Sequence, residues 1–570
     1  MGGIPFEQTD VLIIGGGGAG IRAAIEAASR GARVIVANKG PVGRSGTTPM
    51  AMEAFQAVAF PGDSEEIHFR DTVEGGYHLG DENLISVLVR DAARRARDLE
   101  AYGVQFKRKA EGAYDPMHHP GQTFPRALFI QGGGFGMLAG LIREARKHPE
   151  IQLLSDVFVC RLTVDREGSI SGALYLDLKD GRVKAIRSNA VVLATGGYEE
   201  LWARNDASCT ACGDGVFLAY EAGAELVDLE MLQYYPTVVI HPPSIRGTLF
   251  QYELITDPEM LGGRLVNGRE EPFFKGKLLR DAVVRAIGKE MRQGRGTPHG
   301  GVYIDLIHST KSREDLTRAL EKWQPNQFHY LKDMGFDLRE TLVEVAPHAH
   351  YTLGGVAIDE EARTMVPGLF AAGEAAGNLH GANRVSGNAL AETQVFGALA
   401  GASAAVWSAE RRSEEKPDAA DGRGQIEALL ERWGRKEEAL RPSTVREKLQ
   451  GILWERCGVE RDAQGLAQGI QELEGIEKEM LDRMTLASIS GDGSFGAYPQ
   501  EVQEALEVRM MASLGKLVMV SALFRKETRG HHMRTDHPSP SSEPVHTLLV
   551  KGKEPREEKV KRREPGKWKG

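Results

Sequence analysis

Gly15-Gly16-Gly17-Gly18-Ala19-Gly20 separates a short apolar run at residues 10–14 from an Ala-rich stretch with helical spacing at residues 20–30. A second apolar run follows at residues 32–37, and the order strand, turn, helix, strand predicts a βαβ unit. Such a turn needs glycine because the chain bends sharply and its backbone must approach a pyrophosphate at the helix N-terminus. The stretch therefore predicts a dinucleotide site contacted by Gly15, Gly17, Gly18, Ala19 and Gly20.

The end of the second predicted strand indicates which dinucleotide is bound. NAD sites usually carry an acidic residue there, whereas this chain has Asn38 followed by Lys39. An asparagine can accept a hydrogen bond from a ribose hydroxyl through its amide oxygen, but it lacks the charge. The substitution weakens the case for NAD and favours FAD, with Asn38 and Lys39 as predicted cofactor contacts.

Two later glycine-containing segments support a flavin site. Ala194-Thr195-Gly196-Gly197 ends a predicted buried strand at residues 189–194, and Gly373-Glu374 follows an apolar strand at residues 368–372. Both segments resemble the later FAD contacts of flavoproteins with two dinucleotide-binding folds, in which Glu374 would reach the ribityl chain. The three segments occur in the order that such a fold requires.

Composition narrows the class of protein. The chain has 570 residues, 41% of them hydrophobic and 26% charged, as in ordinary globular proteins. Its net charge of −9 gives no electrostatic support for binding nucleic acid. Four cysteines exclude a disulfide scaffold and favour a reducing cytoplasm. We find no run of about 18 apolar residues, so we expect no membrane span, and no basic segment that would indicate a signal peptide.

The pattern along the chain predicts several domains. We expect helices at residues 83–106 and 135–147 and antiparallel strands at residues 151–165 and 170–178. Cofactor-like motifs lie on both sides of a dissimilar block, which indicates one domain interrupted by another. The predicted division is a discontinuous FAD-binding domain at residues 1–235 and 346–408, a capping domain at 236–345, a helical domain at 425–525, and a C-terminal segment at 526–570. Residues 551–570 are predicted to form a solvated basic tail.

Further motifs lie at residues 212–215, 222–224, 280–285, 301–305, 350–356, 381–384, 387–390 and 525–531. These segments resemble the flavoprotein subunits of the succinate dehydrogenase and fumarate reductase family, which includes L-aspartate oxidase and adenylylsulfate reductase. The resemblance implies an α/β fold: a Rossmann-like FAD-binding domain of the two-dinucleotide-fold type with an inserted α+β capping domain and a C-terminal helical domain. Carried over by motif, it adds Ser45, Thr47, Asp214, Asn388, Ala389 and Leu390 to the predicted cofactor contacts.

The family's chemistry moves a hydride between flavin N5 and a carbon beside a carboxylate, while an arginine passes a proton on the other face. The resemblance implies that Arg280 donates or accepts the proton and that His350 and Arg384 bind the substrate carboxylate. A guanidinium is suited to a carboxylate because it presents a bidentate fork. The structural alternative for Arg280 is an ion pair with Asp281 or with a glutamate.

The chain departs from the family at three places. Gly46 stands where family members with covalent FAD carry a histidine, so we predict non-covalent FAD. Tyr235 stands in place of a substrate-binding histidine and can still donate one hydrogen bond, although it cannot become cationic near neutral pH. Thr256 and Glu259 replace a glutamate and an arginine that relay protons. Either Asp257 or Glu259 rebuilds the relay, or the reaction is altered.

The remaining motifs do not predict a metal site. Cys209 and Cys212 form a single C-x-x-C, which we interpret as two reduced thiols near the flavin, with a redox or metal role as the alternative. His118-His119 and His531-His532 lack further ligands at suitable spacing for zinc. The sequence also lacks an iron–sulfur cysteine pattern, so single-electron transfer requires clusters on another subunit.

These observations predict an FAD-dependent oxidoreductase subunit that acts on a small carboxylate of the fumarate or succinate type and works with an iron–sulfur partner. The expected location is the cytoplasm, at the inner face of a membrane if partner subunits anchor there. Two alternatives stay open. One is a stand-alone oxidase like L-aspartate oxidase; the other is a flavin electron-transfer subunit that has altered or lost its carboxylate chemistry.

Overall fold

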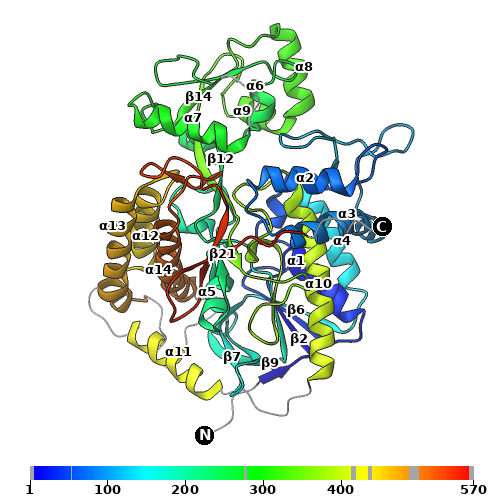
Figure 1. The fold of residues 1–570 in the computed structure, drawn as a ribbon, viewed down its shortest axis with the longest axis vertical. Helices are drawn as coiled ribbons and strands as arrows, with labels where there is room; N and C mark the ends of the chain where they lie inside the picture. Colours follow the sequence, from blue (N-terminus) through cyan, green and yellow to red (C-terminus); the bar gives the residue numbers. More distant parts are fainter. Residues whose placement is uncertain are drawn as a thin grey trace.

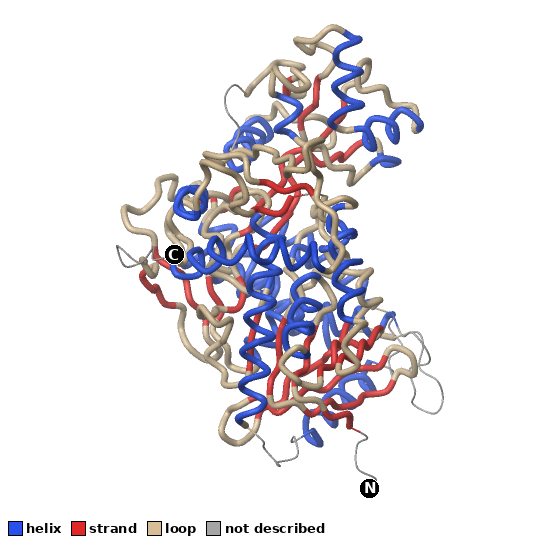
Figure 2. The backbone as a smooth tube through the Cα atoms, turned by 90° about the vertical axis from the view of Figure 1, so that its right-hand side faces the viewer, coloured by secondary structure: helices blue, strands red, loops and turns tan. Residues whose placement is uncertain are grey.

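The computed structural model describes residues 6–52, 54–274, 279–411, 419–433, 440–486 and 500–563. These residues form a large body and a smaller lobe that projects from it, seen at the top of Figure 1. In the view of Figure 2, turned by 90°, helices lie against the strands of the larger body. The structure is thus the mixed α/β fold that the sequence predicts.

A five-stranded parallel sheet forms the centre of the larger body, in the order β17-β10-β2-β3-β6. Its residues are largely buried and apolar because helices cover a parallel sheet on both faces. The glycine turn follows β2 and leads into helix α1 (Gly18–Ala28). The strands are β2 (Val11–Ile14), β3 (Val34–Asn38), β6 (Ile151–Ser155), β10 (Ala190–Leu193) and β17 (Leu369–Ala371).

Helix α10 (Asn388–Glu410) packs along α1 through two glycines. A Cβ atom on Gly397 would lie 2.6 Å from the carbonyl oxygen of Ala19, and one on Gly401 would lie 2.2 Å from that of Ala23. By length and composition alone α10 could cross a membrane, but 67% of its most apolar window is buried inside the fold. Its apolar composition therefore reflects a core position. The neighbouring helices α3 (Glu82–Ala101) and α4 (Gly133–Ala145) end five and two residues before the predicted ends.

The strand predicted at residues 151–165 is wrong as one element. Its first part, β6, joins the parallel sheet beside β3. Asp156 then turns the chain with a φ of 62°, and β7 (Val157–Val164) pairs antiparallel with β8 (Ile170–Asp177). The second sheet has the order β1-β9-β8-β7 and includes β1 (Phe6–Gln8) and β9 (Arg182–Arg187). The sequence pattern concealed the change of sheet because apolar residues continue on both sides of Ser155-Asp156.

The projecting lobe has its own hydrophobic core and a second antiparallel sheet, in the order β12-β15-β14-β13. Strands β12 (Leu232–His241) and β15 (Val343–Thr352) pair with each other and connect the lobe to the larger body (Figure 1). Both strands cross the predicted boundaries near residues 235 and 346, and the domain division itself stays a prediction. The lobe also contains α6 (Tyr252–Thr256), α7 (Arg280–Arg292), α8 (Arg313–Trp323), α9 (Pro325–Asp333), β13 (Arg264–Val266) and β14 (Val302–Asp305).

Helices dominate the described part of residues 419–524, and the chain then returns to strands. Strand β20 (Val545–Leu549) pairs with β11 (Leu226–Val227) on one side and with β21 (Arg556–Lys559) on the other. Residues 551–563 are mostly exposed, as predicted for a solvated tail, but they are not free, because β21 pairs with β20 and Arg562 binds Glu82. Residues 564–570 lie outside the described residues. The helices are α11 (Ala419–Trp433), α12 (Pro442–Arg456), α13 (Ala463–Gly475) and α14 (Gln500–Phe524).

Replacing glycine by alanine should have opposite effects on stability at Gly401, which lies in the contact between α1 and α10, and at Gly451, which lies outside it. Gly401→Ala should lower the free energy of unfolding by about 1–3 kcal/mol, because the new methyl group overlaps the backbone of Ala23. Gly451 lies in α12, where a Cβ would have no atom within 4 Å. There the same change should raise stability by about 0.5–1 kcal/mol through helix propensity. Denaturant unfolding of both variants tests the contact, and equal effects would contradict it.

Candidate active site

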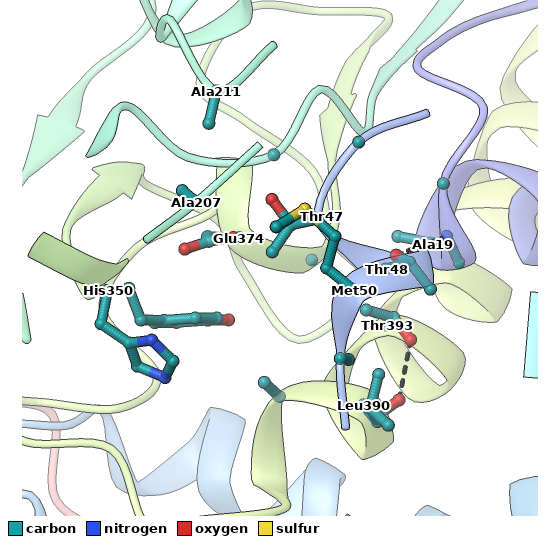
Figure 3. A pocket seen from close by; sticks show the side chains of 18 of the residues that line it. Ala19, Thr47, Thr48, Met50, Ala207, Ala211, His350, Glu374, Leu390 and Thr393 are labelled. Atoms are coloured by element: carbon teal, nitrogen blue, oxygen red, sulfur yellow. Dashed lines mark hydrogen bonds between the residues drawn. The ribbon is translucent and has the colours of Figure 1, made fainter. Parts of the chain in front are cut away.

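A cavity of about 470 Å³ lies at the carboxyl ends of β2, β3, β10 and β17, beneath the projecting lobe. Open α/β sheets bind their ligands at this edge, and the volume is typical of a ligand site. In Figure 3, Ala19, Thr47 and Thr48 lie on one side of the cavity, Glu374 lies between, and His350 lies on the other side. The first group belongs to the glycine-turn side and His350 to the side that contains the predicted substrate residues.

The glycine turn forms one wall of the cavity. Gly15, Gly17, Gly18 and Ala19 line it, and the N–H of Gly18 donates to Thr48 Oγ1 at 3.0 Å. Gly20 does not line the cavity. A Cβ there would lie 1.9 Å from the carbonyl oxygen of Gly15, so Gly20 lets α1 pack on the turn.

Asn38 lines the cavity, and its side chain also binds within the protein. Its Oδ1 accepts from the N–H of Gly16 at 2.9 Å, while Nδ2 donates to the carbonyl of Gly40 and to Ser45 Oγ. Asn38 thus holds the glycine turn and the following loop together, and its contact with a ribose stays a prediction. Ser45 and Thr47 also line the cavity.

Lys39 and Asp214 also line the cavity, but they bind each other. Lys39 Nζ lies 3.1 Å from Asp214 Oδ1 and 3.0 Å from Oε1 of Glu507 on α14, and Arg446 Nη2 binds the other oxygen of Glu507 at 2.6 Å. Although burial would raise the pKa of Glu507, Lys39 and Arg446 lower it to about 2. These side chains form a buried ionic cluster in the cavity wall.

Only some residues of the later predicted cofactor segments line the cavity. Ala194, Thr195 and Gly196 line the cavity, whereas Gly197 lies behind it against Thr352 and Glu199. Ala389 and Leu390 line the cavity. Asn388 does not, because it is fully buried and its Oδ1 pairs with His68 Nε2 at 2.9 Å.

Glu374 lines the cavity and forms a pair with a second buried carboxyl group, Glu199. Both Oε1 atoms lie 3.0 Å from the N–H of Thr352. Burial, reinforced by Glu199, raises the pKa of Glu374 well above its ordinary value, and the pKa of Glu199 is raised as well. The raised pKa values favour a proton held by the pair over two charged carboxylates. The sequence prediction did not include Glu199.

Four predicted substrate residues meet at the other end of the cavity. His350, on β15, binds Asp206 through Nδ1 at 3.0 Å, and its Nε2 lies 3.4 Å from Arg384 Nη2. Burial, reinforced by Arg280, lowers the pKa of Arg384 to about 10. The Arg384 Nε is buried without a partner among the described residues. Tyr235, on β12, lies with its ring centroid 5.0 Å from that of His350.

Arg280, the first residue of α7, faces this group. Its Nη1 donates to Gln233 Oε1 at 2.9 Å, and its guanidinium lies 4.8 Å from the centre of the Tyr235 ring. Gln233 in turn donates to Asn383 and to the carbonyl of Arg384. The sequence analysis missed Gln233, although it stands two residues before Tyr235 on the same strand and so shares its face.

Glu253, on α6, is the acidic side chain beside Arg280. Its Oε1 lies 3.8 Å from Arg280 Nη2, it lines the cavity, and burial raises its pKa. The prediction that Asp257 or Glu259 takes this position is wrong, because Asp257 instead accepts from the N–H of Glu259 beyond the end of α6. Arg280 pairs with Glu253 and not with Asp281, which binds Arg285. The short helix places Glu253, three residues before Thr256, beside the arginine, a position that depends on the fold and not on the order of the motif.

The cysteine pair lies near the cofactor wall. All four cysteines are free. Cys212 is buried and its Sγ accepts from Arg446 at 3.7 Å, while burial raises its pKa to about 12. Cys212 is therefore a thiol at neutral pH. Within the described residues, no group of three or more His, Cys, Asp or Glu side chains is arranged to hold a metal ion.

Comparison with known proteins now identifies the family. Residues 10–390 match the FAD binding domain family, and residues 446–564 match the fumarate reductase flavoprotein C-terminal family. The chain belongs to the fumarate reductase flavoprotein family. It is therefore a flavin oxidoreductase, as the sequence predicts.

Relatives match over nearly the whole chain. A CoM/CoB fumarate reductase subunit of Methanothermobacter marburgensis is 35% identical over 562 residues, covering 96% of this chain and 97% of the relative. The fumarate reductase flavoprotein subunit of Escherichia coli is 31% identical over 561 residues, covering 93% and 88%. A solved E. coli quinol fumarate reductase is similar in structure, with a TM-score of 0.87 at 29% identity and coverage of 98% of both chains.

The cavity fits FAD, the cofactor of this family. Its wall combines a glycine turn at the N-terminus of α1 with the ends of three parallel strands, which suits a pyrophosphate. A Cβ on Gly196 would meet no atom within 4 Å, so open space adjoins the backbone there. Thr195 Oγ1 is buried without a partner among the described residues, as expected of a group that contacts a ligand.

Proposed function

We propose that this chain is a flavoprotein subunit that reduces or oxidises a small dicarboxylate of the fumarate or succinate type. The observation that supports this most strongly is the pairing of Arg280 with Glu253 opposite Arg384 and His350 in one cavity. Bound FAD would supply hydride transfer at N5. The residues of the chain would bind the substrate, orient it and deliver the proton.

Arg384 is suited to hold one carboxylate. It is buried, its Nε has no partner among the described residues, and its contact with His350 leaves donors for a ligand. Because Asp206 occupies His350 Nδ1, the second ring nitrogen faces Arg384 and the substrate. Tyr235 would donate its hydroxyl beside them. These roles are predictions that the arrangement supports.

Arg280 is suited to pass a proton to the substrate. An arginine with an ordinary pKa above 12 gives up a proton only if a neighbouring group restores it at once. Glu253 is placed to do this, since its Oε1 lies 3.8 Å from Arg280 Nη2 and burial raises its pKa, which favours the protonated form. Gln233 fixes the other side of the guanidinium. With Glu253 in this position, the changes at residues 256–259 no longer favour a flavin subunit without carboxylate chemistry.

We further propose an iron–sulfur partner subunit. The chain has four cysteines, too scattered to bind a cluster, and several relatives are named as subunits. Electrons taken singly from the flavin would need clusters on another chain. Such a partner would also decide whether the complex lies in the cytoplasm or at the inner face of a membrane.

The reaction is tested by anaerobic photoreduction of the purified holoprotein, followed by a panel of saturated and unsaturated carboxylates. Reoxidation of the flavin by fumarate or a related unsaturated dicarboxylate is expected, measured by its absorbance. Reoxidation only by oxygen, with peroxide formed, would favour the stand-alone oxidase. If neither dicarboxylate nor oxygen reoxidises the flavin, the chain is an electron-transfer subunit.

Arg280→Lys should lower turnover at least about 100-fold, because lysine keeps the charge but loses the planar fork and its reach. FAD content and reduction by dithionite should stay normal, since Arg280 lies in the lobe away from the glycine turn.

Arg384→Ala should mainly raise KM, because it removes a hydrogen-bond donor to the substrate carboxylate. Steady-state kinetics measure both effects, and near-normal turnover of Arg280→Lys would assign Arg280 a structural role.

FAD should be bound non-covalently, because Gly46 offers no imidazole where the cavity wall passes this position. Acid precipitation of the holoprotein should release the yellow colour into the supernatant, measured by absorbance. Colour that stays with the washed pellet would show a covalent bond and refute the proposal.

A further inference from the structure

A polar side chain that the proposed mechanism does not use faces the reaction end of the cavity. His119 lines the cavity, and its Nε2 is buried without a hydrogen-bond partner among the described residues. A buried polar nitrogen normally has a partner, so an unpaired one in a cavity wall indicates a ligand contact. The other unpaired buried polar atoms at this end belong to Glu253 and Arg384, which flank the proposed substrate position.

The loop that carries His119 is held in place independently of its side chain. The N–H of His119 donates to Gln122 Oε1 at 3.0 Å, and His118 Nε2 contacts the carbonyl of Gln122 at 2.7 Å. At the base of the loop, the fully buried Arg126 forms ion pairs with Asp63 and Asp71. The imidazole of His119 is therefore presented by a fixed backbone and is not needed to hold it.

The same loop lies beside the arginines that the proposed reaction requires. Pro120 and Gly121 line a small adjoining cavity of about 20 Å³ together with Glu253, Arg280 and Arg384. Burial, reinforced by Arg280, His118 and Arg384, lowers the pKa of His119 to about 4. At neutral pH the ring is uncharged and has one N–H to donate, and the nearby cations favour an anionic partner.

We propose that His119 contacts the substrate directly and donates a hydrogen bond from Nε2 to an oxygen of the carboxylate that Arg384 does not hold. This inference rests on the proposed function. A buried dicarboxylate offers several acceptor sites on each of its two carboxylates, and Arg384 can satisfy the acceptors of only one of them. His119 then serves the other carboxylate, which makes His119 a determinant of dicarboxylate over monocarboxylate specificity.

The test measures binding to the oxidised holoprotein, not turnover, through perturbation of the flavin spectrum by malonate and by propionate. His119→Phe keeps an aromatic ring but removes both nitrogens, and His119→Gln keeps one donor. His148→Phe is the matched control, because His148 follows α4 and does not line the cavity. FAD content and thermal unfolding are recorded for each variant.

His119→Phe should weaken malonate binding by about tenfold to a hundredfold, the effect of losing one hydrogen bond to a charged group. Propionate binding by His119→Phe should stay nearly unchanged. His119→Gln should weaken malonate binding less than His119→Phe does, and His148→Phe should bind both ligands as the parent protein does. Unchanged malonate binding in His119→Phe would overturn the inference and leave the proposed function intact. Equal weakening of both ligands with lowered thermal stability would assign His119 a structural role, which also overturns it. If the parent protein binds no malonate and no dicarboxylate reoxidises its flavin, the proposed function fails together with this inference.

Discussion

The backbone at Gly15 comes so close to the neighbouring strand that no side chain can occupy the space between them. A Cβ on Gly15 would lie 2.1 Å from the carbonyl oxygen of Ala194, and one on Gly20 would lie 1.9 Å from that of Gly15. This contact fixes β2 against β10 and brings the N-terminus of α1 to the edge of the sheet. The glycine wall of the cofactor site depends on this contact, because it places the N-terminus of α1 beside the ends of β2 and β10.

At the other end of the cavity, the main energetic constraint on the structure is the burial of positive charge. Arg280 and Arg384 lie in one cavity, and the nearby acids do not neutralise both. Glu253 lies 3.8 Å from Arg280, and Asp206 is bound to His350. Burying cations without full compensation is costly. An anionic substrate would supply the missing charge, so the same feature that costs the protein stability favours binding of a dicarboxylate.

The sequence predicted those parts that local chemistry determines. The strand–glycine–helix pattern placed the cofactor wall correctly because the turn permits few residues, and family motifs brought Arg280, His350, Arg384 and Tyr235 to one cavity. Glu199 and Glu253 were not predicted, and Asn38 and Asn388 have protein partners that their residue types did not indicate. Such a partner can lie far along the chain, as with Asn388 and His68, which are 320 residues apart. A residue type indicates what a side chain can bind, but the fold decides which partner reaches it.

The ionic cluster in the cavity wall couples the cofactor site to the order in which the chain is made. Lys39 leaves the ribosome early, whereas Glu507, its second counter-charge, follows 468 residues later on α14. Until that helix docks, Lys39 has only Asp214 to balance its charge. A truncation before α14 would keep every residue that lines the cavity but would remove the second counter-charge that holds Lys39 in its wall.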